Sequence, residues 1–382
     1  MKRLLSLVLL CVLLVILSGC GTTVHVRHLV PGEVDLSGSR NLAIASTSSY
    51  RFSYGRPVSP WVSGLQETDF TLSSGFDADI PDRVAAMASQ YLISAIEDKQ
   101  YFTLLSPDAT DAYLSLSKAG EDSVRLLTEK GFSILMTSEI SYMDVTERVE
   151  GVDRREFVTN SSGLSSEQVT KREYYLVQEA TLGLSYMISN LKTGRVLVSD
   201  SSTDKEEKRT RIGIRYYQDD GTYRDERDYT SGFSPSFDSL FQNILERITE
   251  RVAIQLAPSW QTEHFSLMKN KPKVPSLEMA YDLAKQGEYH RAYEQFLKTW
   301  MEDQHLGSGY NASLMLAGLG KLQEAVDLMN QVYNLHGDTR SHDTLLILQE
   351  ALSQDAQAQK QISGEISDDG QGVVMTQYMI ME

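Results

Sequence analysis

Apolar and polar positions repeat with two different periods along the first two thirds of the chain, and each period predicts a type of element. Short apolar or alternating runs predict strands at residues 41–45, 102–105, 132–145, 174–188 and 195–202. Apolar residues spaced three and four positions apart predict amphipathic helices at 82–95 and 237–252, and a further helix is expected at 122–130. The resulting order, β-α-β-α-β-β-β-α, predicts an α/β fold with a mixed sheet that helices cover mainly on one face.

Turn and capping residues separate these elements. Asp82 stands where an N-cap is expected, and Gly131 follows the helix expected at 122–130 as a C-terminal cap. Lys192-Thr193-Gly194 has the composition of a hairpin turn. The predicted α/β domain therefore runs from residue 35 to residue 265.

The C-terminal third has an internal period of 33 residues. Its first copy contains Ala284, Gly287, Tyr289, Ala292 and Phe296, which recur as Ala317, Gly320, Leu322, Ala325 and Met329. This spacing resembles tetratricopeptide repeats, which are helix pairs, although the tryptophan and proline of that consensus are absent. We expect an all-α, tetratricopeptide-like region at 276–352, a basic linker at 266–275 and a disordered tail at 353–382. Two unrelated helical hairpins are the alternative.

The inner faces of the first helices in such repeats form a peptide groove by default. In this register the groove residues are Leu277, Tyr281, Lys285, Tyr310 and Leu314. The alternative is that the same side chains pack against the α/β domain. Leu345, Leu348 and Leu352 predict a capping helix after the repeats.

The first twenty residues have the layout of a secretory signal. Lys2 and Arg3 precede an apolar run from Leu4 to Leu17, which is too short for a membrane-spanning helix. Leu17-Ser18-Gly19-Cys20 resembles the bacterial lipobox, which implies a signal peptide at 1–19, acylation of Cys20 and membrane attachment through that lipid, followed by a tether at 20–34. Gly21 after the cysteine implies sorting to the outer membrane, facing the periplasm. An ordinary signal peptide or uncleaved anchor with an incidental cysteine is the alternative.

The strand Arg40-Asn41-Leu42-Ala43-Ile44 and the element order after a lipobox resemble a periplasmic α/β domain. That domain occurs in the curli secretion-channel lipoprotein, the lipoprotein activators of penicillin-binding proteins and the Tol translocation protein. Curli channels insert two long hairpins into the membrane, and the matching segments here are 147–171 and 204–234. The second offers only Ile212, Ile214 and Tyr216 as an alternating face, so solvated hairpins are expected instead of a pore.

Charge and motif content limit the functions that remain. The formal net charge of −16 argues against nucleic acid as a partner. No catalytic, cofactor-binding or metal-binding motif is present, and the two cysteines exclude a disulfide framework. We therefore expect a non-enzymatic lipoprotein that serves as an interaction platform or assembly factor in the cell envelope, with its protein partners and oligomeric state open. The alternatives are an export-channel subunit and an enzyme built from scattered residues.

Overall fold

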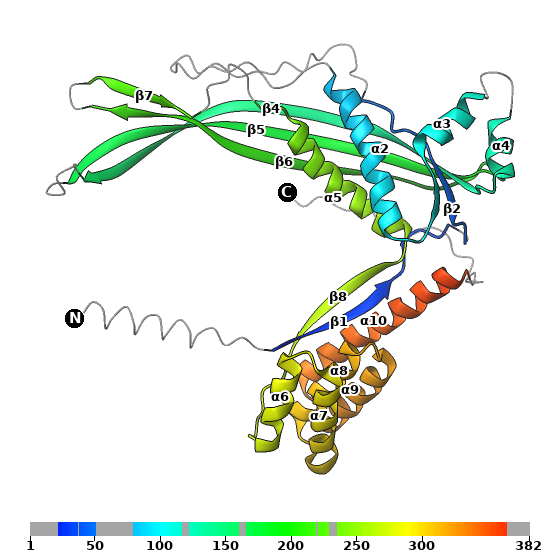
Figure 1. Cartoon of the computed structure of the whole chain (residues 1–382). Coiled ribbons are helices and arrows are strands. Elements are labelled where there is room, and N and C mark those ends of the chain that lie inside the picture. The colour runs from blue at the N-terminus through cyan, green and yellow to red at the C-terminus, as the bar shows by residue number, and fades with distance from the viewer. Residues whose placement is uncertain are drawn as a thin grey trace. The chain divides into compact units, whose positions relative to one another are not determined.

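The computed structural model describes residues 22–36, 38–50, 79–116, 122–159, 166–218, 221–228 and 235–364 (Figure 1). These residues form two compact units. Unit 1 combines the described residues up to Gly32 with those from Pro258 onwards, and unit 2 spans Glu33–Ala257. Cys20, the expected signal peptide and residues 365–382 of the expected tail lie outside the described residues.

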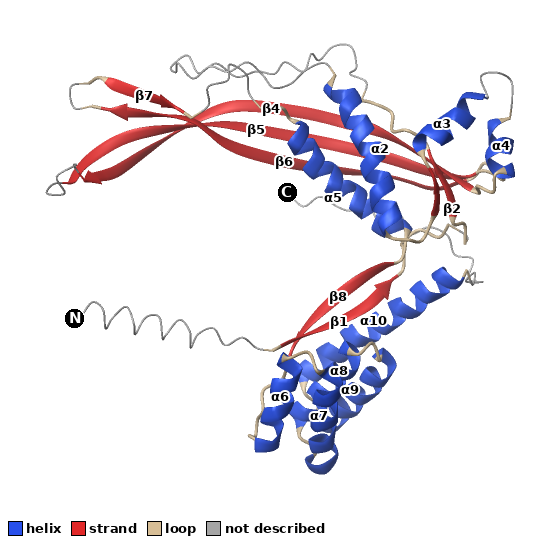
Figure 2. Cartoon of the chain, in the orientation of Figure 1, coloured by secondary structure: helices blue, strands red, loops and turns tan. Residues whose placement is uncertain are grey.

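Unit 2 contains a mixed six-stranded sheet with the strand order β3-β2-β4-β5-β6-β7 (Figure 2). Strand β2 is parallel to β3 and β4, and the remaining neighbours are antiparallel. The strands are β2 (Asn41–Ile44), β3 (Thr103–Leu105), β4 (Ile134–Thr159), β5 (Ser166–Asn190), β6 (Val196–Tyr217) and β7 (Tyr223–Arg227). The α/β class and the mixed sheet are therefore confirmed.

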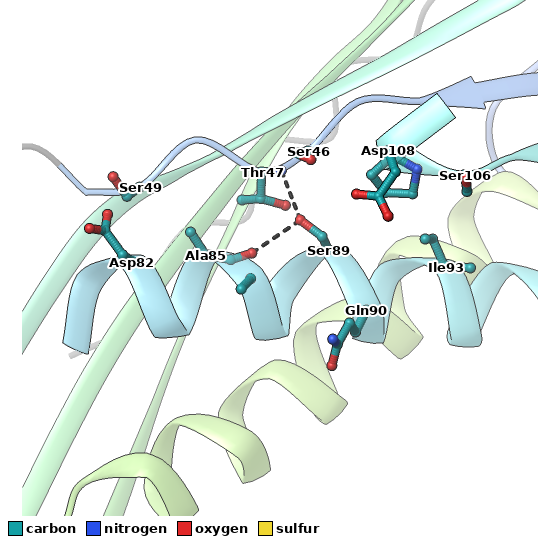
Figure 3. A pocket seen from close by; sticks show the side chains of 12 residues that line it. Ser46, Thr47, Ser49, Asp82, Ala85, Ser89, Gln90, Ile93, Ser106 and Asp108 are labelled. Carbon is teal, nitrogen blue, oxygen red and sulfur yellow. Dashed lines mark hydrogen bonds between the residues drawn. The ribbon is translucent and has the colours of Figure 1, made fainter. Parts of the chain in front are cut away.

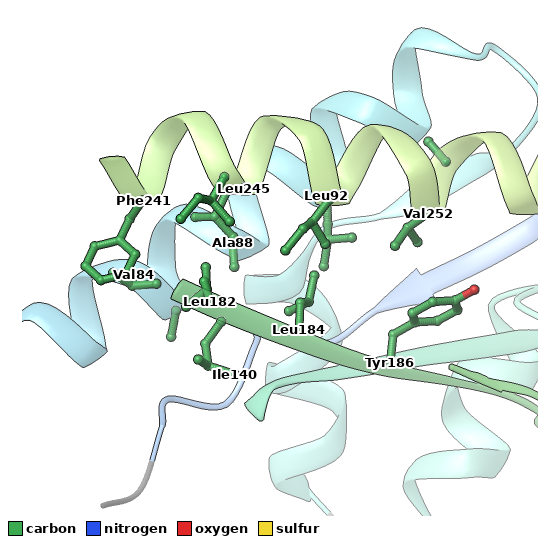
Figure 4. Packing of buried hydrophobic residues seen from close by; sticks show 14 of the residues in the cluster. Val84, Ala88, Leu92, Ile140, Leu182, Leu184, Tyr186, Phe241, Leu245 and Val252 are labelled. Atoms are coloured by element: carbon green, nitrogen blue, oxygen red, sulfur yellow. The ribbon is translucent and has the colours of Figure 1, made fainter. Parts of the chain in front are cut away.

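Two long helices, α2 (Ile80–Asp98) and α5 (Asp238–Leu256), lie side by side on one face of this sheet (Figure 2). Their apolar stripes meet alternate residues of β5, and burial of these side chains supplies the main core of the unit. Figure 4 shows this packing, to which these helices and β5 contribute Val84, Ala88, Leu92, Phe241, Leu245, Val252, Leu182 and Leu184.

The helix boundaries differ from the predicted ones at two places. Helix α2 begins two residues before Asp82: Asp79 takes the N-cap position, and Asp82 lies in the first turn. Helix α3 (Pro107–Leu116) follows β3 directly, where sequence analysis predicted no element. Proline suits the first turn of a helix because its missing N–H has no intrahelical partner there. Helix α4 (Ser123–Glu129) confirms the helix expected at 122–130, and the Asp122 carboxylate accepts a hydrogen bond from Arg125 N.

Strands β4, β5 and β6 are much longer than the apolar patterns predicted. Strand β4 continues 14 residues beyond Val145, and β5 begins eight residues before Tyr174. The prediction stopped where the residues become charged, because alternation of apolar and polar residues ends there. The strands continue because opposite charges on neighbouring strands face each other, as described below.

Unit 1 consists of a two-stranded antiparallel ribbon, β1 (Thr23–Val30) with β8 (Ser259–Ser266), and a run of packed helices. A short 3-10 turn at Pro275–Leu277 precedes the helices. These are α6 (Glu278–Lys285), α7 (Tyr289–Asp303), α8 (Leu306–Gly318), α9 (Leu322–His336) and α10 (Thr339–Ser363). The predicted all-α region is confirmed, and α10 contains the residues expected in a capping helix.

The 33-residue period recurs in the backbone of unit 1. Helices α7 and α9 begin and end 33 residues apart, and Gly287 and Gly320 have φ angles of 76° and 77° in the turns that precede them. Glycine is required there because the left-handed region is unfavourable for residues with a Cβ. The sequence repeat therefore corresponds to a repeat of helix pairs.

Three expected boundaries of unit 1 are wrong. Residues 20–34 were expected to be a tether, but Val24 and Val26 of β1 are fully buried against the helices. The expected linker at 266–275 contributes Leu267 to the same core. The helix α10 extends to Ser363, so residues 353–363 of the expected tail are helical. The alternation of Val24 and Val26 with His25 and Arg27 is itself a strand pattern, which the expectation of a tether after the lipobox passed over.

Candidate functional site

A hollow of about 500 Å³ with a mixed polar and apolar lining opens in unit 2 between residues 46–49, helix α2 and the start of α3 (Figure 3). This volume lies in the range of small-molecule sites. The lining combines hydroxyls, one amide and two carboxylates with a few small apolar groups. Its polar members are Ser46, Thr47, Ser49, Asp82, Ser89, Gln90, Ser106 and Asp108.

The floor of the hollow is formed by a close approach of the chain after β2 to helix α2. Thr47 N donates to Ser89 Oγ at 2.9 Å, and Ser89 Oγ in turn donates to the carbonyl of Ala85 at 3.1 Å (Figure 3). On the other side, the hydroxyls of Thr47 and Ser138 are hydrogen-bonded at 2.8 Å. Ala85 and Ser89 are small enough to let the segment lie against the helix. The floor is therefore fixed on both sides by buried hydrogen bonds.

Two carboxylates stand at helix N-termini on opposite sides of the hollow (Figure 3). Asp82 is in the first turn of α2 and Asp108 in the first turn of α3. The positive end of a helix dipole stabilises an ionised carboxylate in that position. A third carboxylate, Asp111, accepts a hydrogen bond from Ser46 N at 3.2 Å and holds the edge of the hollow.

This lining favours neutral or positively charged groups that form hydrogen bonds. Among the described residues its lining contains carboxylates but no lysine, arginine or histidine, so this part of the hollow would repel a phosphate or carboxylate ligand. The same described lining places no imidazole or thiol beside its serines. No sequence signal marked it, since its residues are common polar types from three separate elements.

The five residues predicted for a peptide groove are placed differently from one another. Leu277, Tyr310 and Leu314 are at most 1% exposed and belong to the core of unit 1. Tyr310 reaches helix α10, where its hydroxyl is hydrogen-bonded to that of Thr344 at 2.9 Å. These three side chains are packing residues and do not line an open groove.

The other two predicted groove residues lie nearer the surface. Tyr281 is half-buried, and its hydroxyl donates to the carbonyl of Met268 at 2.6 Å and accepts from Asn311 Nδ2 at 3.0 Å. Burial raises the pKa of Tyr281 to about 12. Lys285 is exposed, with Nζ 3.5 Å from Asp282 Oδ1. The structure therefore does not bring the five residues together on one accessible surface.

Within the described residues, no group of three or more histidine, cysteine, aspartate or glutamate side chains has the arrangement of a metal site. No helix in the described ranges combines the length and apolar character needed to cross a bilayer.

The second candidate surface is the far part of the sheet, which sequence analysis did not identify. We call residues 146–156 of β4, 170–179 of β5, 205–217 of β6 and all of β7 the distal sheet. Its small apolar cluster is separate from the main core and contains Val149, Tyr174, Leu176 and Ile212. Its outer face is the one opposite α2 and α5, since alternate residues of a strand point to opposite faces.

Cross-strand ion pairs cover the outer face of the distal sheet. The nearest charged atoms are 2.8 Å apart in Arg154–Glu173, 2.6 Å in Lys171–Glu156 and 2.8 Å in Lys205–Glu179. The Tyr175 hydroxyl, 2.7 Å from Glu173, holds the pKa of that carboxyl below its usual range, against the effect of desolvation and together with the two cations. Lys171 also lies 3.4 Å from Glu173, so Arg154, Glu173, Lys171 and Glu156 form one connected network, the arrangement in which surface ion pairs contribute most.

Arginine–tyrosine contacts add to this order on both faces. Arg209 Cζ lies 4.2 Å from the centre of the Tyr175 ring on the outer face. On the inner face, Arg215 forms two hydrogen bonds with the Asp225 carboxylate at 2.7 and 2.8 Å, and its Cζ is 3.8 Å from the centre of the Tyr223 ring. Such contacts depend on strand register, which the sequence alone does not reveal.

The comparisons with known proteins give remote structural likenesses only. The chain matches no protein-family model, and no curated protein matches it. Among solved structures it is similar to a PelC dodecamer from Paraburkholderia phytofirmans, with 8% identity, a TM-score of 0.21 and coverage of 61% of this chain and 98% of that one. It is also similar to a protein described as a neuraminyllactose-binding hemagglutinin homolog from Helicobacter pylori, with 9% identity, a TM-score of 0.28 and coverage of 60% and 91%. TM-scores this low support no statement about function or assembly.

Proposed function

We propose that this chain is a lipid-anchored protein of the bacterial cell envelope, held through Cys20 and facing the periplasm from the outer membrane. It acts without catalysis, as a platform on which other envelope proteins assemble. The lipobox Leu17–Cys20 supports the anchor, and the distal sheet supplies the platform.

The observation that carries the proposal is the ordered, charged surface of the distal sheet. In β5 it extends from residue 170 to residue 179, roughly 30 Å at the rise of a strand. Ion pairs and arginine–tyrosine contacts hold its side chains in place, so this surface would lose less side-chain entropy on binding a partner than a surface of free charges would. Enrichment in arginine and tyrosine is also typical of residues that dominate protein–protein interfaces.

The absence of catalysis is part of this proposal. The hollow beside α2 offers hydrogen-bonding groups to a small polar ligand, and the described part of its lining places no imidazole or thiol at its serines. It therefore suits binding, which would allow a small hydroxyl- or amine-bearing molecule to modulate the platform.

An export-channel subunit is the second candidate, favoured by one observation. Strands β4, β5 and β6 are 26, 25 and 22 residues long, well above the ~9–11 residues that a membrane-spanning strand needs. Against it, the distal sheet carries charges on both faces, with Arg154 on the outer face and Arg215 on the inner face. Exposing a charged face to lipid is costly, so we favour the platform.

The test combines a lipid assay with a binding assay on native envelopes. Metabolic labelling with a palmitate analogue is expected to mark the wild-type chain and not Cys20→Ser. Arg209→Glu, on the outer face, is expected to remove co-purifying envelope proteins. Arg125→Glu is the matched control, because Arg125 is an exposed, ion-paired residue of α4 away from the distal sheet.

Two results would count against the proposal. An unlabelled wild-type chain would exclude the lipid anchor. The same set of co-purified proteins from wild type, Arg209→Glu and Arg125→Glu would exclude the distal sheet as the platform. Integration of the purified chain into vesicles as ring-shaped oligomers would favour the channel instead.

A further inference from the structure

The folded part of unit 1 begins immediately after the predicted lipid attachment site. The carbonyl of Thr22 accepts a hydrogen bond from Leu267 N at 3.0 Å, and strand β1 begins at Thr23. Only Gly21 stands between Thr22 and Cys20. At ~3.3–3.6 Å per residue, the Cα atoms of Cys20 and Thr22 are at most about 7 Å apart. An acylated Cys20 would therefore hold this end of unit 1 directly at the bilayer surface.

The loop at this end of unit 1 has a fixed conformation. It comprises residues 268–274, which follow β8 and precede α6, and we call it the basal loop. Met268 N donates a hydrogen bond to Asn311 Oδ1 at 2.8 Å, and the Met268 carbonyl accepts one from the Tyr281 hydroxyl. Further along, the Asn270 side chain bonds to both the N–H and the carbonyl of Val274, at 2.9 and 2.8 Å. The buried Asn311 thus holds the start of the basal loop, and the Asn270–Val274 bonds close the loop on itself.

The basal loop carries three exposed lysines in a chain whose formal net charge is −16. Lys273 forms an ion pair with Glu278 at 3.0 Å. Lys269 and Lys271 have no ion-pair partner among the described residues. The two positive charges that are not neutralised by a neighbour are therefore presented by a rigid loop close to the anchor.

We propose that the basal loop is a membrane-contact surface that binds anionic phospholipid headgroups of the leaflet holding the Cys20 lipid. This inference rests on the proposed lipid anchor. The short distance between Cys20 and Thr22 brings the loop within reach of the headgroups, and lysine charge complements them. Each lysine close to an anionic bilayer strengthens the binding of the loop to that bilayer about fivefold. The contact restricts how unit 1 is presented above the bilayer, which a lipid on a flexible tether would not do.

The test uses the full acylated chain in vesicles and a fluorophore close to the basal loop. Cys20 is the only cysteine after the predicted cleavage site, and acylation blocks its thiol, so a new cysteine is the single labelling site. Ser276→Cys places bimane on an exposed residue next to the loop, and Gln359→Cys places it on an exposed residue of α10. Gln359 lies roughly 30 Å along α10 from Arg340, which contacts the carbonyl of Ser266. The vesicles contain phosphatidylcholine with a headgroup-nitroxide quencher, with or without phosphatidylglycerol.

We expect phosphatidylglycerol to increase quenching at Ser276→Cys severalfold and to leave Gln359→Cys unchanged. Lys269→Gln with Lys271→Gln should abolish that increase. Lys298→Gln with Lys360→Gln is the matched control, because it removes two exposed lysines of unit 1 outside the loop and should preserve the increase.

Mass spectrometry of the purified chain separates the two proposals. A chain without acyl groups would refute the lipid anchor and with it this inference. An acylated chain whose quenching at Ser276→Cys does not respond to phosphatidylglycerol would refute the basal-loop contact and leave the anchor standing. An equal response in the two double-lysine variants would also refute the contact, because general charge would then explain the effect.

Discussion

Gly309 is the position where adding one methyl group tests the packing of unit 1 most directly. It lies in helix α8, where the residues from Gly307 to Ala317 are all buried. A Cβ at Gly309 would lie 2.5 Å from Trp300 Cε3 of α7 and 2.6 Å from Val332 Cγ2 of α9. Normal carbon–carbon contacts are about 3.5–4.0 Å. Gly309→Ala therefore forces two neighbouring helices to move.

The expected cost is the difference between two opposing effects. Glycine to alanine inside a helix ordinarily stabilises it by about 1 kcal/mol. Overpacking a well-filled core costs about 1–3 kcal/mol, and the upper end applies because Trp300 and Val332 come from two different helices. The free energy of unfolding of unit 1 should therefore fall by about 2 kcal/mol, against the direction that helix propensity predicts.

Urea unfolding followed by tryptophan fluorescence measures this change. Two of the three tryptophans, Trp260 and Trp300, belong to unit 1, so the measurement is made in a Trp61→Phe background, where the signal reports on the affected unit. Adding Val332→Ala should lower the cost of Gly309→Ala, and the double-mutant cycle should show a favourable coupling energy. A Gly309→Ala variant as stable as wild type, or more stable, would refute the close packing of α8 between α7 and α9.

Three further outcomes are expected. Tyr310→Phe removes the buried hydrogen bond to Thr344 and should lower the free energy of unfolding by about 1–3 kcal/mol, measured by urea unfolding, whereas an unchanged midpoint would show that water replaces the hydroxyl. Gly320→Ala should cost about 1 kcal/mol in the same assay because its φ of 77° is unfavourable for alanine although the Cβ meets open space; no loss would indicate a different turn. Burial would raise the pKa of Asp204, but hydrogen bonds from Arg247 and a backbone N–H lower this pKa overall. Ionised Asp204 therefore stabilises unit 2 at pH values above the pKa that Asp204 has in the unfolded chain. This contribution is lost as the pH falls through the lower pKa of the folded state. The cost of Arg247→Ala, about 1 kcal/mol at neutral pH for such exposed groups, should therefore shrink in acid, and a cost independent of pH would contradict the assignment.

Sequence reasoning succeeded where one periodicity determined one element. The apolar stripe from Val84 to Leu92 predicted α2, and Gly287 and Gly320 marked equivalent turns of the repeat. In these cases the residues that define the element are close together in the chain, so their spacing is visible without the fold. The 33-residue period also placed the helix pairs correctly, whereas membership of the tetratricopeptide class stays a prediction.

The misses have a shared physical cause, which is stabilisation by partners distant in sequence. Arg154 looks like a loop residue until the register places it beside Glu173 on β5. The pocket residues Thr47 and Ser89 acquire their roles only when the chain after β2 meets α2. The repeat register places Tyr310 on the first helix of a pair, which predicts a groove residue. The register does not show that α10 packs over this side chain, where Thr344 bonds to its hydroxyl.

Strand β1 and helix α10 have a consequence for how the molecule is made. Leu29 N donates to the Asp355 carboxylate and Gly32 N to the side-chain carbonyl of Gln361, so the last described helix completes the environment of the first strand. A chain synthesised N-terminus first can pair β1 with β8 only after more than 200 further residues, and can add the α10 contacts only after more than 300. Unit 2 lies wholly between these segments and contains its own core, so its folding can precede that closure. A chain truncated before α10 would keep the β1–β8 pairing but lose these partners, so the stability of its N-terminal segment depends on the helix that is synthesised last among those described in unit 1.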